Sequence, residues 1–125
     1  MISRILTLSG TSSYFLLGPR GVGKTKFLLN HFPNALYIDL LEDEKFNMLL
    51  SSTQRLEQLI EDSGKKQVVI DEVQKIPRIL DEVHRLIEKN NIQFILTGSS
   101  ARKLRSSGVN LLAGRAITKY MYPLT

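Results

Sequence analysis

One short segment, GPRGVGKT at residues 18–25, constrains this chain more than any other. It fits the pattern G-x-x-x-x-G-K-[ST], a glycine-rich loop whose backbone can surround phosphate groups. Residues 14–17 before it are apolar and aromatic, as in a short strand, and residues 26–31 after it favour a helix. Strand, loop and helix in that order is the context in which the pattern is informative. The alternative interpretation is a glycine-rich turn that happens to precede a lysine.

The residue types of this loop explain how it would bind phosphate. Gly18, Gly21 and Gly23 allow positive φ angles and a close approach of the backbone, so successive N–H groups can point at an anion. A helix that begins near Gly23 adds the positive end of its dipole. Lys24 supplies a mobile charge for the outer phosphates, and the Thr25 hydroxyl suits Mg²⁺. The expected nucleotide-binding residues are Gly18, Pro19, Arg20, Gly21, Val22, Gly23, Lys24, Thr25 and Lys26.

Length and composition indicate one domain over residues 1–125, with room for one core. The hydrophobic content of 42% and charged content of 23% are ordinary for a globular chain. Cysteine is absent, which excludes disulfides and thiolate metal sites. No apolar run is long enough to span a bilayer, and residues 1–6 are too few and too polar for a signal peptide. We therefore expect a cytoplasmic protein without a membrane partner.

The net charge of +5 arises entirely near the C-terminus. All 12 acidic residues precede Ser99, whereas basic residues continue beyond it. A solvated basic helix face would explain this distribution. Phosphate, nucleic acid or an acidic neighbouring surface are the alternative partners. The basic residues after Ser99 are Arg102, Lys103, Arg105, Arg115 and Lys119.

Strand-like and helix-like segments alternate along the chain, which predicts an α/β fold. Strands are expected near 14–18, 35–40, 68–72, 92–97 and 116–121. The first helix follows the phosphate loop and ends near 31, and a second begins near 42. A break and N-cap at 51–53 begins a third helix, and two more are expected at 77–90 and 99–104. Because right-handed βαβ units build parallel sheets, the pattern predicts a five-stranded parallel sheet in a three-layer α/β/α sandwich. Ligands bind such sheets beyond the carboxyl ends of the strands, where Lys24, Asp39, Asp71 and Thr97 are all expected.

A second candidate constellation, Asp71 and Glu72, ends the third predicted strand. Asp71 is expected to hold Mg²⁺, usually through water, and Glu72 to polarise the water that attacks a γ-phosphate. Two solvated acids at the end of a strand are the plain alternative. The phosphate loop upstream favours the functional interpretation.

Small polar residues follow the fourth predicted strand. Thr97 is a candidate sensor that touches the γ-phosphate or the lytic water, while Ser99 or Ser100 could equally cap the next helix. Asp39 could restrain Glu72, although capping of the following turn is the favoured interpretation.

Five segments in register carry a family resemblance: GPRGVGKT at 18–25, YIDL at 37–40, VIDEVQKIP at 69–77, FILTGSS at 94–100 and LAGR at 112–115. The chain resembles the prokaryotic AAA-type ATPases with the motifs GPRxxGKT, IDExQ, LTGSS and LAGR. This resemblance implies an AAA+ core of the ASCE class of P-loop NTPases, the strand order 5-1-4-3-2, and binding and hydrolysis of ATP with Mg²⁺.

The resemblance also sets expectations about partners. Family members usually continue into a lid and a C-terminal domain, whereas this sequence stops at Thr125, so we expect a fragment or a shortened member without the lid. By its position, Arg115 resembles an arginine finger that reaches a neighbouring subunit, which implies a homo-oligomer; a salt bridge is the alternative.

The sequence therefore leads to one principal hypothesis about function. We expect a domain that binds ATP and Mg²⁺, hydrolyses ATP slowly, and acts as a conformational switch for a C-terminal domain or partner. The first alternative is a nucleic-acid-binding module that uses the basic region 99–120, with ATP in a regulatory role. The second is a small-molecule kinase.

Overall fold

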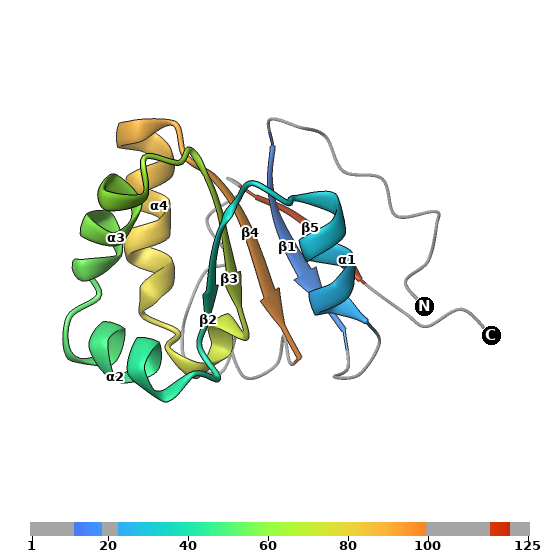
Figure 1. Cartoon of the computed structure of the whole chain (residues 1–125), viewed down its shortest axis with the longest axis horizontal. Helices are drawn as coiled ribbons and strands as arrows, with labels where there is room; N and C mark the ends of the chain where they lie inside the picture. The colour runs from blue at the N-terminus through green and yellow to red at the C-terminus, as the bar shows by residue number, and fades with distance from the viewer. Residues whose placement is uncertain (1–11, 19–22, 100–115, 121–125) are drawn as a thin grey trace.

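Five parallel strands form one sheet in the order β2-β3-β4-β1-β5 (Figure 1). A computed structural model describes residues 12–18, 23–99 and 116–120 of the chain. Read from the other edge, the order is the 5-1-4-3-2 that the family resemblance implies, so the predicted fold class is confirmed. The strands are β1 (Ser13–Leu17), β2 (Leu36–Asp39), β3 (Gln67–Asp71), β4 (Gln93–Gly98) and β5 (Ala116–Tyr120).

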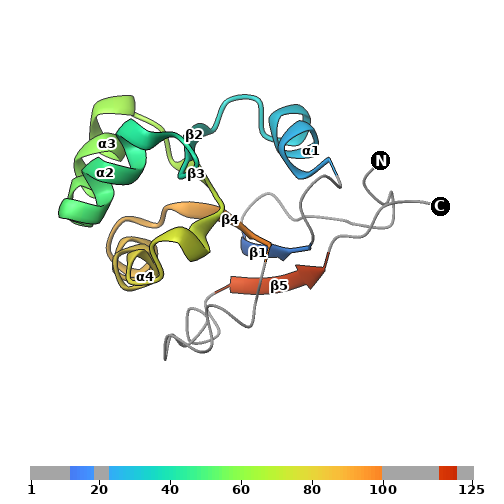
Figure 2. The same ribbon diagram turned by 90° about the horizontal axis from the view of Figure 1, so that it is seen from below.

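Helices cover both faces of this sheet, as the three-layer prediction requires (Figure 2). Helix α1 lies on one face, and α2, α3 and α4 lie on the other. A 3₁₀ turn, η1, follows β3 and leads into α4. The bounds are α1 (Lys24–His31), α2 (Asp43–Ser51), α3 (Arg55–Ser63), η1 (Val73–Lys75) and α4 (Ile79–Asn90).

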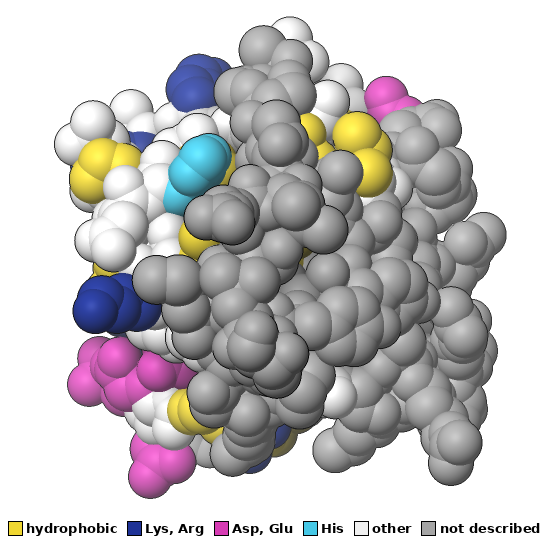
Figure 3. All heavy atoms as spheres, turned by 90° about the vertical axis from the view of Figure 1, so that its right-hand side faces the viewer, with side chains coloured by type: hydrophobic (Ala, Val, Ile, Leu, Met, Phe, Trp, Pro, Cys, Tyr) yellow, Lys and Arg dark blue, Asp and Glu magenta, His cyan; other side chains and the backbone are white. Residues whose placement is uncertain are grey.

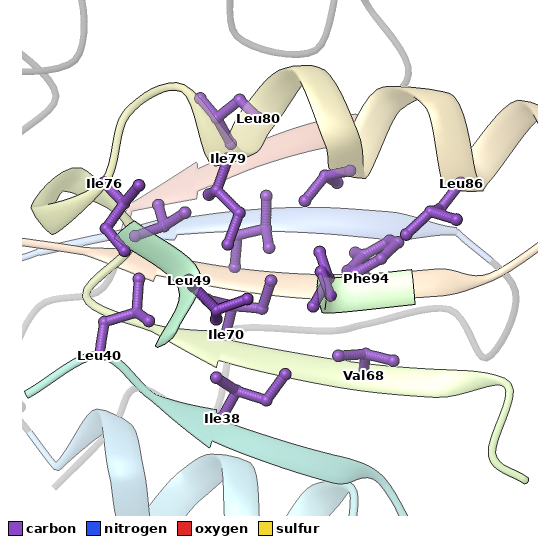
Figure 4. Close-up of a cluster of buried hydrophobic side chains, with 14 of the residues drawn as sticks. Ile38, Leu40, Leu49, Val68, Ile70, Ile76, Ile79, Leu80, Leu86 and Phe94 are labelled. Carbon is purple, nitrogen blue, oxygen red and sulfur yellow. The ribbon is translucent and has the colours of Figure 1, made fainter. Parts of the chain in front are cut away.

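Successive apolar side chains along the buried strands point to alternate faces of the sheet, so the core has two parts, one on each face. Val68 and Ile70 of β3 pack towards α2, α3 and α4, while Val69 packs towards α1. Phe94 and Ile95 of β4 separate in the same way. Because successive side chains of a strand point to opposite faces, strands covered on both sides need the unbroken apolar runs seen in this sequence. Figure 4 shows the larger cluster, in which side chains of α4 point towards the strands.

Helix ends agree with the sequence in part. Acidic residues do occupy the first turn of α2, as predicted. The predicted N-cap at 51–53 is wrong, because α3 has Gln54 at that position and no side-chain cap; Ser52 and Thr53 instead accept backbone bonds in the turn between the helices. The predicted helix at 99–104 falls, beyond Ser99, outside the described residues.

Exposed apolar side chains are scattered over the described surface. The large ones are Leu29 on α1, Leu41 between β2 and α2, Leu50 on α2 and Ile117 on β5. On the side that bears α1 and β5, most of the acidic side chains in view lie at the lower left, and a separate group lies at the upper right (Figure 3). Within the described ranges, no helix combines the length and the apolar character needed to span a bilayer.

Two adjacent leucines of α1 provide a matched test of this packing. Leu28 is fully buried under the sheet, whereas Leu29 is half exposed. We expect Leu28→Ala to lower the free energy of unfolding by about 2–5 kcal/mol because it leaves a cavity, and Leu29→Ala to change it by less than about 1 kcal/mol. Urea denaturation measures both. Equal losses would contradict the placement of α1.

Candidate functional site

A cleft lies at the edge of the sheet where the strands end. Its volume is about 480 Å³, and it is lined by Gly23, Lys24, Thr25, Lys26, Leu41, Asp71 and Glu72. These residues come from the start of α1, from the segment after β2, and from the last residue of β3 and the one after it. The cleft therefore brings residues of the phosphate-loop motif together with the carboxylate pair.

Lys24 is the first residue of α1 and is almost fully buried. Gly23 before it has φ 83° and ψ 21°, a left-handed conformation that glycine adopts without strain. The Lys24 ammonium donates hydrogen bonds to the carbonyls of Gly18, at 3.0 Å, and Gly98, at 3.3 Å. Its Nζ also lies 3.6 Å from Oε2 of Glu72. The charge is thus held between the ends of β1 and β4 and beside a carboxylate.

Asp71 accepts hydrogen bonds from three hydroxyl groups. Thr25 Oγ1 donates to Oδ2 at 3.1 Å, Tyr37 donates to the same oxygen, and Thr97 donates to Oδ1. Burial and the bond to this carboxylate raise the pKa of Tyr37 above its ordinary value, so the phenol remains a donor at neutral pH. The carboxylate ties α1, β2 and β4 to the end of β3.

A bend in the backbone brings Glu72 into the same site. Residue 71 points to the α1 face, so a continuing strand would turn residue 72 towards the opposite core. Glu72 instead has φ 62° and ψ 52°, a conformation uncommon for a residue with a side chain. Its N–H donates to Thr97 Oγ1 at 3.0 Å. The bend lets two consecutive acids face one cleft.

A comparison with known protein families agrees with this geometry. The family model described as AAA domain matches residues 11–125. The chain belongs to this AAA family. A search of curated proteins found no match. Membership supports nucleotide binding by the AAA domain and is consistent with ATPase activity, and the family match confirms the resemblance stated from the sequence motifs.

The structure of the AAA domain brings together part of the predicted site. Lys24, Thr25, Asp71 and Glu72 converge, and Lys26 and Gly23 line the cleft beside them. Thr97 is fully buried and is not among the lining residues. It contacts Asp71 and the backbone of Glu72, which do line the cleft. Pro19, Arg20, Gly21, Val22, Ser100 and Arg115 lie outside the described residues, as do Arg102, Lys103 and Arg105.

The structure bears on the alternative roles that the sequence left open for Asp39 and Ser99. Asp39 Oδ1 accepts the Leu41 N–H at 2.9 Å, which supports the interpretation that Asp39 caps the turn after β2. Ser99 directs its hydroxyl to Glu72, at 3.1 Å from Oε1. Its side chain therefore has a partner in the site, which the sequence alone had not indicated.

Sequence reasoning assigned no role to Tyr37 or Gln74. Tyr37 pairs in register with Val69, and Asp39 pairs with Asp71. Tyr37 is therefore on the same face as Asp71, and a parallel register combined with the length of tyrosine could have indicated this contact. Gln74 contacts Glu72 from the turn after it. It is the last residue of the IDExQ motif at 70–74, which is the sequence signal that could have indicated this position.

The oxygen atoms of Thr25 and Asp71 are of the kind that binds a magnesium ion. Mg²⁺ prefers oxygen ligands and in nucleotide sites uses one or two protein groups together with water and phosphates. Thr25 and Asp71 supply a hydroxyl and a carboxylate oxygen 3.1 Å apart at the cleft. Among the described residues, no three His, Asp or Glu side chains are grouped as a metal site would need, so a cage built from protein ligands alone is not indicated there.

The contact between Tyr37 and Asp71 should make the stability of the AAA domain fall at alkaline pH. The pKa of Tyr37 is raised in the folded protein, so its contribution is complete below the unfolded value near 10 and declines above it, where only the unfolded chain ionises. We expect the difference in Tm between wild type and Tyr37→Phe to be constant from pH 7 to 9 and to shift against wild type by pH 11. Thermal unfolding measures this; a constant difference up to pH 11 would contradict the contact.

Proposed function

We propose that this AAA domain binds ATP with Mg²⁺ and hydrolyses it slowly to ADP and phosphate. The observation that carries the proposal is the convergence of Lys24 with Glu72, and of Thr25 with Asp71, in one cleft at the carboxyl edge of the sheet. Open parallel sheets bind ligands at this edge. The start of α1 adds unpaired N–H groups and a positive dipole end to the same place.

Lys24 would bind the outer phosphates. Its three donors now contact two carbonyls and a carboxylate, and phosphate oxygens would replace some of these acceptors with stronger, charged ones. Backbone N–H groups of residues 20–23 would surround the phosphates, since Pro19 has no N–H and the Gly18 N–H already donates to the Gly98 carbonyl. A positive charge that is buried and already oriented needs little reorganisation on binding.

Thr25 and Asp71 would hold the magnesium ion, Asp71 through water. When bound, Mg²⁺ would neutralise charge on the phosphate oxygens. Thr97 and Tyr37 would keep the Asp71 carboxylate in place, since both donate to it. The hydroxyl of Thr25 would then turn from Asp71 to the metal.

Glu72 would act as the base for hydrolysis. The oxygen of a water molecule forms a bond to the γ-phosphorus, the bond from phosphorus to the bridging oxygen breaks, and ADP leaves with that electron pair. Glu72 accepts the proton of the attacking water. Slow turnover is expected because the cleft is open to solvent along α1, where Thr25 and Lys26 are exposed.

The contacts of the cleft also support a switch. Lys24 binds the Gly98 carbonyl and Glu72 binds Ser99, so both side chains contact the end of β4. When Lys24 moves to phosphate, it would lose its bonds at the end of β4, and the change would be felt at Gly98 and Ser99. The receiver would be a C-terminal domain, a partner, or a neighbouring subunit contacted by Arg115.

Two substitutions separate binding from hydrolysis. We expect Lys24→Ala to weaken ATP binding on the order of 100-fold because it removes a charged donor to phosphate. Glu72→Gln should bind ATP as wild type does and lower the hydrolysis rate on the order of 100-fold or more. Calorimetry measures binding, and release of phosphate measures turnover.

Matched controls make these results specific. Lys66→Ala removes the same charge from an exposed position just before β3, at the opposite edge of the sheet, and Glu61→Gln changes an exposed acid of α3. Both should leave binding and turnover unchanged. Wild-type turnover in Glu72→Gln would remove Glu72 from the mechanism, and wild-type binding in Lys24→Ala would contradict the phosphate site.

A further inference from the structure

We propose that Gln74 is a positioning residue for Glu72: together with Ser99 it holds one carboxylate oxygen, so that the other faces the phosphate cleft. The consequence for turnover rests on the proposed function of Glu72 as a base. The arrangement itself rests on contacts between described residues. It adds a role for the turn after β3 that neither the phosphate-loop motif nor the carboxylate pair contains.

The hydrogen bonds of the Glu72 carboxylate are divided unequally between its two oxygens. Gln74 Nε2 donates to Oε1 at 2.5 Å, and Ser99 Oγ donates to the same oxygen at 3.1 Å. Gln74 Nε2 also lies 3.1 Å from Ser99 Oγ. Among the described residues, Oε2 has a single polar partner, the Lys24 ammonium 3.6 Å away. If Lys24 turns to phosphate, Oε2 becomes the oxygen that can accept a proton from water.

The backbone after β3 is shaped to bring Gln74 to this position. Glu72 has a left-handed conformation, and η1 follows at once, with the Lys75 N–H bonded to the Glu72 carbonyl at 3.1 Å. Gln74 thereby turns back onto the residue two positions before it. Its side chain is buried, with 4% of the residue exposed, so few other orientations are open to the amide.

The other end of the amide is poorly satisfied. Gln74 Oε1 is buried and has no hydrogen-bond partner among the described residues. It faces Gly98, where a Cβ would lie 3.0 Å from this oxygen. A buried acceptor without a partner is unfavourable, and an apolar side chain of similar length would avoid this loss. Packing therefore does not explain glutamine here, whereas the contact of its Nε2 with Glu72 does.

An amide suits this role better than a charged donor. Lysine or arginine at this position would place a full positive charge on the carboxylate and weaken it as a base. The neutral amide fixes the orientation of Glu72 without that charge. It also remains in place when the Lys24 ammonium moves away, so the carboxylate keeps its direction during the reaction.

Gln74→Met tests the proposal, because methionine keeps the length of the side chain and removes the donor. We expect kcat for ATP hydrolysis to fall about 10- to 100-fold, since a misplaced catalytic group loses that much. The Kd for ATP should stay within about 3-fold, and the Tm should not fall. Gln58→Met is the matched control: Gln58 is exposed on α3 and donates to Asp62, so kcat should not change. A wild-type kcat in Gln74→Met, or a loss of kcat matched by a lower Tm and weaker binding, would overturn the proposal.

A second measurement does not depend on hydrolysis. The side-chain amide resonance of Gln74 in the full chain is identified by its loss in Gln74→Met. We expect it to shift in Glu72→Gln and in Ser99→Ala, and to stay in place in Glu61→Gln. A wild-type chain without ATPase activity would overturn the proposed function alone. The arrangement would then be decided by this resonance, whose failure to shift in Glu72→Gln would overturn it.

Discussion

The carboxylate of Asp71 is the point on which the site depends. It accepts hydrogen bonds from the hydroxyl groups of residues on α1, β2 and β4. Each of these elements lies in a different part of the sequence. A buried carboxylate is tolerated only when it is well hydrogen-bonded, so the requirement to satisfy Asp71 fixes the ends of three elements relative to β3. Thr97 extends this control to Glu72, because its oxygen also accepts the Glu72 N–H. The geometry of the cleft thus depends on one buried carboxylate at the end of β3.

The bend at Glu72 is the second requirement. A regular strand would separate consecutive acids onto opposite faces, and the left-handed conformation turns the second acid back to the first. Such backbone is unfavourable for a residue other than glycine. Here the Thr97 bond to the N–H, the η1 turn and the contacts of the carboxylate with Gln74, Ser99 and Lys24 support it. Strained backbone at a cluster of charged side chains is typical of functional sites.

Much of the fold could be predicted because its signals are local and repeated. Apolar runs marked the first four strands, and the glycine-rich loop located the start of α1. The convergence of Lys24 and Asp71 followed from topology, since the carboxyl ends of parallel strands share one edge. The N-cap of α3 could not be predicted, because Ser and Thr at 51–53 bond in the turn instead of capping. The contacts of Tyr37 and Gln74 depend on register and on one unusual φ angle, and a sequence pattern contains neither. The roles assigned to Lys24, Thr25, Asp71 and Glu72 remain proposals that the geometry supports.

The central claim is that this cleft recognises phosphates. Calorimetric titration of the wild-type chain with adenosine, AMP, ADP and ATP, each with Mg²⁺, tests it most directly. Because the described lining includes Lys24, Lys26 and the two carboxylates that suit a phosphate-bound metal ion, affinity should rise with the number of phosphates, and adenosine alone should bind too weakly to detect. Adenosine binding as tightly as ATP, or an affinity independent of the number of phosphates, would contradict the account.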